Sequence, residues 1–119
     1  MRYANPNNDS QVVVAKGEID KGLMNKEAWS FSNVIIPDFS WGGDQKIHYA
    51  EEGNVVELNN EIYVLYRFAC RKSLMLHFDT NTNKLELYKI IDFEGGWCKF
   101  FIQKYKDTYY AMGNHLCFP

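Results

Sequence analysis

Short turns divide most of this chain into brief runs that are rich in β-branched and aromatic residues. Asn59 and Asn60 separate "NVVEL" from "EIYVLYRF", and residues 80–83 separate the next two runs. Asn-rich turns between such runs are hairpin signals, whereas apolar residues at helical spacing have no sustained window. The pattern therefore predicts an all-β chain built from antiparallel hairpins.

Eight strands are predicted along the 119 residues. They cover residues 11–17, 28–36, 54–58, 61–68, 73–79, 84–93, 99–105 and 108–114. Residues 37–53 form the longest segment without strand character, and "DKGLMNKEAW" is a place for a short turn of helix. A chain of this length builds one core, so a small eight-stranded sandwich or barrel is one architecture that fits.

A repeat favours a different architecture. Asn54 aligns with Lys99, an offset of 45 residues (99 − 54), and an apolar run, a turn and an aromatic run follow each of them. That period is typical of a four-stranded propeller blade. We therefore expect residues 1–119 to be a single partial propeller module of about two blades. Its parts are the outer strands of one blade (11–36), a complete blade (54–93) and the inner strands of the next (99–114).

Several motifs support this expectation. The stretches "EEGNVVEL", "IYVLYRF", "IIDFEGGWCKFFIQ" and "NKEAWSFSN" resemble the sialidase-like (BNR-type) six-bladed β-propellers, a glycoside hydrolase-like family. The resemblance covers most of residues 18–114, although the aspartate-box pattern of the family is absent in intact form. It implies a propeller fold and a parent family that acts on glycans.

Three residues are candidates for catalysis if the chain is a sialidase-like hydrolase. Arg67 ends an apolar strand, where a guanidinium suits a sugar carboxylate; alternatively it pairs with Glu51 or Glu52 and fixes a corner. Glycoside hydrolysis usually requires carboxyl groups, and adjacent strand residues point to opposite sides, so at most one of Glu51 and Glu52 faces the site. Glu52 is preferred because it lies nearer the "EGN" corner. The resemblance implies a Tyr nucleophile, for which Tyr49 in the long connection is the freer candidate.

Further residues are predicted to lie at the same end of the strands and to bind substrate. They are Trp41, Glu51, Asn54, Arg71, Trp97, Lys99, Asn114 and His115. An indole at Trp41 or Trp97 would stack on a sugar ring, or else fill the space between blades.

Charge and composition restrict the partners. The formal net charge is −2 and Lys and Arg form no run, which argues against nucleic acid and against an anionic membrane. Three cysteines without paired spacing suit reduced thiols, so we expect a cytoplasmic chain, or a secreted or periplasmic one if an upstream segment is missing. No metal pattern is present and no cofactor is expected.

Two blades do not close a ring, which predicts a homo-oligomer. Three copies would supply six blades, so a trimer is favoured. For the isolated chain we favour carbohydrate binding or a structural role over catalysis. The alternative is an active glycoside hydrolase, acting on acidic or sialylated glycans once assembled.

Overall fold

Antiparallel strands form three separate sheets in the computed structural model, which describes residues 11–42, 47–69, 71–94 and 98–114. The first sheet pairs β1 (Ala15–Gly17) with β2 (Trp29–Phe31), and the last pairs β7 (Phe100–Tyr105) with β8 (Thr108–Gly113). Between them, β3 (Ile47–Leu58), β4 (Glu61–Ala69), β5 (Lys72–Asp79) and β6 (Lys84–Asp92) form one meander. The described residues contain no α-helix, only 3-10 turns at Ile19–Lys21, Lys26–Ala28 and Phe39–Gly42.

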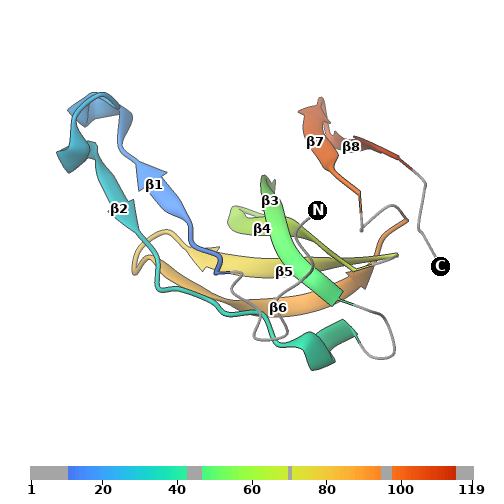
Figure 1. Cartoon of the computed structure of the whole chain (residues 1–119). Helices are drawn as coiled ribbons and strands as arrows, with labels where there is room; N and C mark the ends of the chain where they lie inside the picture. Colours follow the sequence, from blue (N-terminus) through green and yellow to red (C-terminus); the bar gives the residue numbers. More distant parts are fainter. Residues whose placement is uncertain (1–10, 43–46, 70, 95–97, 115–119) are drawn as a thin grey trace.

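The prediction of an all-β, antiparallel chain is confirmed (Figure 1). Its strands divide into sheets of two, four and two in chain order. The alternative of a single closed barrel is wrong for the described strands. The meander is open, because β3 and β6 lie at its two edges and do not pair with each other.

Turn chemistry explains why the central hairpins were predictable. Asn59 and Asn60 have φ values of 53° and 62°, the left-handed conformation that a tight two-residue hairpin requires and that Asn tolerates. Lys106, in the turn between β7 and β8, is also left-handed, with a φ of 54°. Each of these turns connects its strands where the sequence pattern placed the break.

Two boundaries differ from the prediction. β3 begins at Ile47, so much of the expected polar connection is strand. The first hairpin is shorter than expected, with an isolated bridge between Val12 and Ile35 beyond its strands. In the interval between this bridge and the paired strands β1 and β2, the Ser32 hydroxyl accepts a hydrogen bond from the Val14 N–H at 2.9 Å. Side-chain hydroxyls that bond the backbone in this way compete with regular strand pairing.

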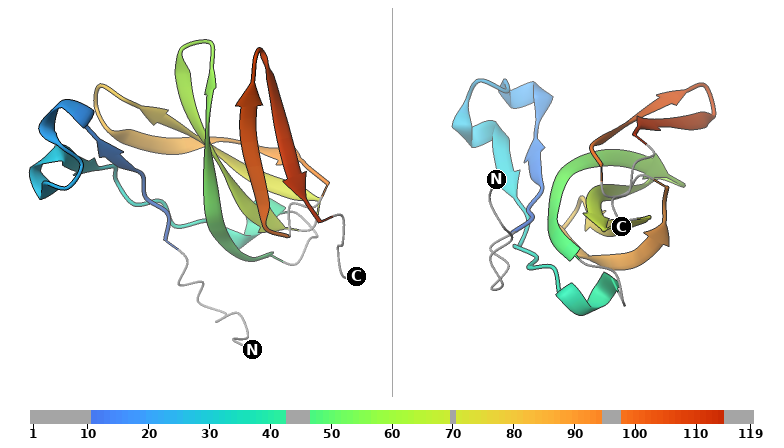
Figure 2. Two further views of the ribbon diagram at one scale, coloured as in Figure 1. Left: turned by 90° about the horizontal axis from the view of Figure 1, so that it is seen from above. Right: turned by 45° about the vertical axis from the view of Figure 1, so that its right-hand side comes forward.

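The central meander buries apolar side chains on both faces, because successive strand residues point to opposite sides. On β4, Val64, Tyr66 and Phe68 face one side and Leu65 faces the other. The first face also buries Val12, Ala50, Leu74, Leu76, Phe78 and Leu85. The second buries Val56, Met75 and Phe100. The β1–β2 hairpin and the β7–β8 hairpin therefore cover opposite faces of the meander (Figures 1 and 2).

Side-chain amides fasten the outer hairpins to the meander. Asn33, just after β2, donates from Nδ2 to the Leu85 carbonyl at 2.9 Å, and its Oδ1 accepts from the Leu85 N–H at 2.7 Å. Asn54 of β3 makes the equivalent pair with β7, to the Phe100 carbonyl and the Ile102 N–H, both at 3.1 Å. An amide side chain thus takes the place of a neighbouring strand at each junction between sheets.

Candidate functional site

Because neighbouring strands are antiparallel, one end of each strand from β3 to β8 lies on the same side of the molecule. The starts of β3, β5 and β7 and the ends of β4, β6 and β8 lie there, while the turns at 59–60, 80–83 and 106–107 lie at the opposite end. The side expected to carry the site is therefore the side on which Glu51, Arg67 and Asn114 are found.

Arg67 is the centre of a charged cluster at this end. Its Nη2 donates to the Glu51 Oε2 at 2.6 Å, across the β3–β4 pair, and its Nε lies 3.4 Å from the Glu52 Oε2. The Arg67 side chain is only 18% exposed, so these contacts hold the guanidinium in a fixed orientation. The alternative predicted pairing of Arg67 with Glu51 or Glu52 is therefore present, and it includes both glutamates.

The prediction that only one of the two glutamates faces this site is wrong. Both carboxylates contact Arg67, because β3 does not alternate regularly here. Its register with β4 shifts on either side of Glu51, and Glu52 is left-handed, with a φ of 55°. A bulge of this kind turns a side chain away from the face that strict alternation would give it.

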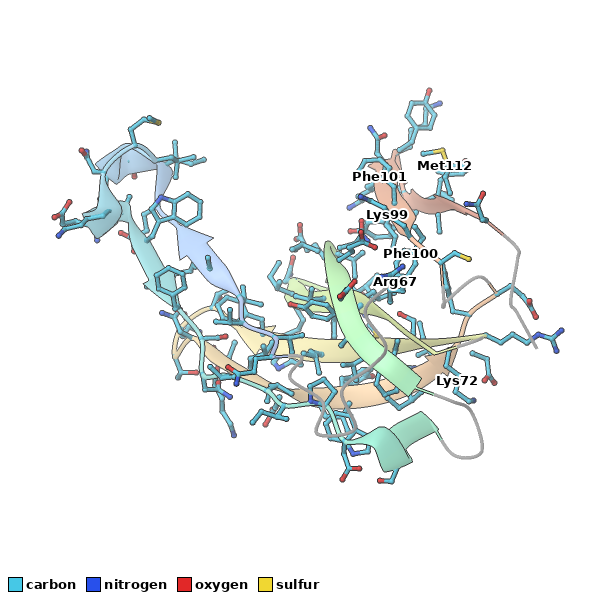
Figure 3. The ribbon with its side chains drawn as sticks, in the orientation of Figure 1. Arg67, Lys72, Lys99, Phe100, Phe101 and Met112 are labelled. Atoms are coloured by element: carbon cyan, nitrogen blue, oxygen red, sulfur yellow. The ribbon has the colours of Figure 1, made fainter. Side chains whose placement is uncertain are left out.

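Lys99 extends the cluster to the next sheet. Its Nζ lies 3.4 Å from the Glu52 Oε1, and its side chain is 77% exposed. Figure 3 shows Arg67, Lys99 and Phe100 close together between β3 and β7, with Lys72 well apart from them. Glu52 therefore bridges a largely buried guanidinium on β4 and a solvent-facing ammonium on the residue that precedes β7.

A second group of charges lies at the ends of β4, β5 and β6. The Arg71 Nε is 3.8 Å from the Glu94 Oε2, and the Lys72 Nζ donates to the Asp92 Oδ1 at 2.9 Å. This hydrogen bond from Lys72 holds the pKa of Asp92 below its usual range. Arg71 thus lies on the predicted side of the molecule, in an exposed pair separate from the Arg67 cluster.

A small cavity of about 140 Å³ adjoins this end of β7 and β8. Its walls are Phe93, Glu94, Phe100, Ala111, Met112, Gly113 and Asn114. Asn114 is the predicted site residue that it contains. Glu94, which pairs with Arg71 and lines the cavity, was not predicted; its place directly after the last strand of the meander was the available signal.

The remaining predicted residues are placed as follows. Trp41 packs against the buried cluster on the first face of the meander, which agrees with the space-filling alternative. Asn54 is engaged by the β7 backbone and so acts as a connector between sheets. Tyr49 was expected in a loop, but its backbone belongs to β3. Trp97 and His115 lie outside the described residues.

Two further observations concern the described part of the chain. Among these residues, no three His, Cys, Asp or Glu side chains gather in a way that would hold a metal ion. None of the described segments forms a helix with the length and apolar character needed to cross a membrane.

Comparison with known proteins gives no relative for this chain: no family model, no curated protein and no solved structure matches it significantly.

Proposed function

We propose that this chain is a sialidase-like propeller module that binds an acidic carbohydrate at the cluster formed by Glu51, Glu52, Arg67 and Lys99. The observation that carries the proposal is the backbone of Glu52. A residue other than Gly in the left-handed conformation costs free energy, and such residues concentrate at binding and catalytic sites. Here that conformation turns the Glu52 carboxylate toward Arg67 and Lys99.

The chemistry of the cluster suits an acidic sugar. Lys99 offers an exposed ammonium to an anionic group, while Arg67 holds the Glu51 and Glu52 carboxylates in place beside it. The Glu51 carboxylate, which is about half exposed, can accept hydrogen bonds from sugar hydroxyls. Glu51 and Arg67 lie on paired strands, which hold side-chain geometry better than loops do.

The same geometry favours binding over hydrolysis. Glycoside hydrolysis usually needs two carboxyl groups on either side of the scissile bond. In this chain both carboxylates contact one guanidinium, so Arg67 occupies the place between them. A sugar carboxylate reaching Arg67 would also have to displace one of them.

The proposal is tested by calorimetric titration with a panel of acidic oligosaccharides, each paired with a neutral oligosaccharide of the same length. Acidic ligands should bind, and Lys99→Ala should weaken them by roughly 10- to 100-fold, the equivalent of one charge-assisted hydrogen bond. Lys99 is exposed, so this variant should keep the fold. Lys84→Ala is the matched control, because Lys84 is 65% exposed and begins β6 at the opposite end of the meander.

Three results would count against the proposal. Acidic and neutral oligosaccharides could bind alike, no member of the panel could bind, or Lys84→Ala could weaken binding as much as Lys99→Ala. A fluorogenic sialoside measures the alternative in parallel. Turnover that disappears in Glu52→Gln would contradict a purely binding role and support a hydrolase.

A further inference from the structure

The two outer hairpins are attached to opposite edges of the meander. The β1–β2 hairpin is fastened to the outer strands, through Asn33 to Leu85 of β6 and through the Lys16 Nζ, which donates to the Thr80 carbonyl at 2.9 Å. The β7–β8 hairpin is fastened to β3 at the other edge. The β1–β2 hairpin is therefore attached at the β6 edge of the meander, and the β7–β8 hairpin at the β3 edge.

The half that β7–β8 leaves uncovered is an apolar groove of about 410 Å³. Its lining comes from the meander and from the nearby hairpin: Val56, Leu58, Leu65, Met75, Lys89, Ile91, Phe93, Ile102, Tyr109 and Ala111. It runs from β8 over the second face of the meander toward β6. On the first face, the corresponding half is where the chain's own β1–β2 hairpin lies.

The β1–β2 hairpin carries exposed apolar side chains on the side turned away from its own meander. Phe31 of β2 is 65% exposed and is paired in register with Ala15 of β1. Val13, Val34 and Ile36, next to these strands, are also exposed. Exposed apolar groups gathered in this way commonly mark an interaction surface.

Among the described residues, β1 and β8 each have one edge that pairs with no other strand, and these two edges are complementary. In a hairpin with a two-residue turn, alternate residues bond their partner strand and the others point outward, which directs the Ala111 N–H of β8 to the free edge. On β1, Val14 and Glu18 bond the partner segment, so Ala15 and Gly17 point outward. Unpaired edges of this kind are templates for another strand.

We infer that the groove is an interface for a second copy of this chain. The β1–β2 hairpin of that copy lies in the groove and pairs its β1 with β8, so that two hairpins from two chains complete a four-stranded antiparallel sheet. The inserted hairpin then covers the outer half of the second face, as the chain's own hairpin covers the outer half of the first. Phe31 of the second copy is buried against the groove.

This contact joins two different surfaces, so it repeats from copy to copy. Heterologous contacts of this type close into rings or continue as filaments. The inference rests on the sheets and their edges and does not depend on carbohydrate binding.

The test is the mass in solution of the intact chain, measured by light scattering coupled to size exclusion over a wide range of concentrations. The wild type should have a mass of two or more times the 14.0 kDa of one chain. Phe31→Glu should shift it toward one chain, because a charge would then have to be buried in the groove. Ala111→Pro should do the same, because it removes an edge donor without breaking a bond to β7.

Met24→Glu is the matched control, since Met24 is 99% exposed in the loop of the same hairpin and should leave the mass unchanged. A wild type of 14.0 kDa at every concentration would overturn the inference, as would a multimer that both interface variants retain. If circular dichroism shows that either variant is unfolded, amide hydrogen exchange of the wild type tests the inference instead. Exchange at Ala15 and Ala111 must slow as concentration rises; exchange that is fast throughout overturns the inference.

Discussion

The side chain of Asn54 binds Phe100 as a neighbouring strand would, with its amide Nδ2 donating to the Phe100 carbonyl oxygen at 3.1 Å. The same side chain accepts from the next outward N–H of β7, at Ile102. Asn33 holds Leu85 of β6 in the same way. The outer hairpins are therefore joined to the meander by amide side chains, each of which donates one hydrogen bond and accepts another.

Replacing Asn54 with Ala should lower the free energy of unfolding by about 1–3 kcal/mol, because two partly buried backbone groups of β7 would lose their partner. Urea denaturation measures the change. Gln103→Ala is the matched control, an amide deletion at an exposed position on β7, and should cost much less. Equal losses for both variants would mean that Asn54 does not fasten the hairpin.

Arg67 and Glu51 should show a measurable coupling energy in a double-mutant cycle. The guanidinium is mostly buried but the carboxylate is about half exposed, so we expect about 0.5–1 kcal/mol in low salt and less in high salt. The variants are Arg67→Ala, Glu51→Ala and their combination, measured by urea denaturation. Strictly additive single changes would contradict the short contact between these side chains.

The centre of the meander should be sensitive to cavities. Leu76 on β5 is fully buried, so Leu76→Ala should cost about 2–5 kcal/mol. Leu87, its register partner on β6, is 39% exposed, and Leu87→Ala should cost roughly 1 kcal/mol or less. Thermal unfolding of the two variants makes the comparison, and a similar loss of stability in both would argue against the core described above.

Tyr66 should make the fold sensitive to alkaline pH. Burial raises the pKa of Tyr66 above its ordinary value near 10. The neutral Tyr66 phenol therefore contributes to the free energy of unfolding. This contribution is fully present below the pKa of Tyr66 in the unfolded chain, and it is lost as the pH rises from about 10 toward the higher pKa in the folded chain. Tyr66→Phe should reduce this alkaline loss in urea denaturation between pH 8 and 11, whereas exposed Tyr105→Phe should not. An unchanged pH dependence in Tyr66→Phe would contradict the assignment.

Turns were the most predictable part of this fold. Asn59 and Asn60 tolerate the left-handed conformation that a two-residue hairpin turn requires, so the sequence pattern alone placed the central hairpin. The start of β3 was missed because the residues from Ile47 to Gly53 do not alternate in polarity, and their pairing with β4 includes register shifts. Local patterns do not record such irregular pairing.

The sequence predicted the side of the molecule on which the candidate site lies, but it did not predict the contacts within that site. The order of the hairpins was enough to bring Arg67, Glu51 and Lys99 to one side. That both glutamates reach Arg67 depends on the backbone of Glu52 at a bulge, which no alternation rule anticipates. The role of Asn54 was also hidden, because its partners lie in another sheet.

The Tyr109 hydroxyl of β8 occupies the backbone groups through which another strand could pair with β3 at Glu57. It donates to the Glu57 carbonyl at 2.7 Å and accepts from the Glu57 N–H at 2.8 Å, on the side of β3 that faces away from β4. A foreign strand approaching β3 at Glu57 therefore finds both backbone groups already occupied. The Tyr109 phenol therefore blocks the pairing of a further strand at this point of β3, the longest of the described strands.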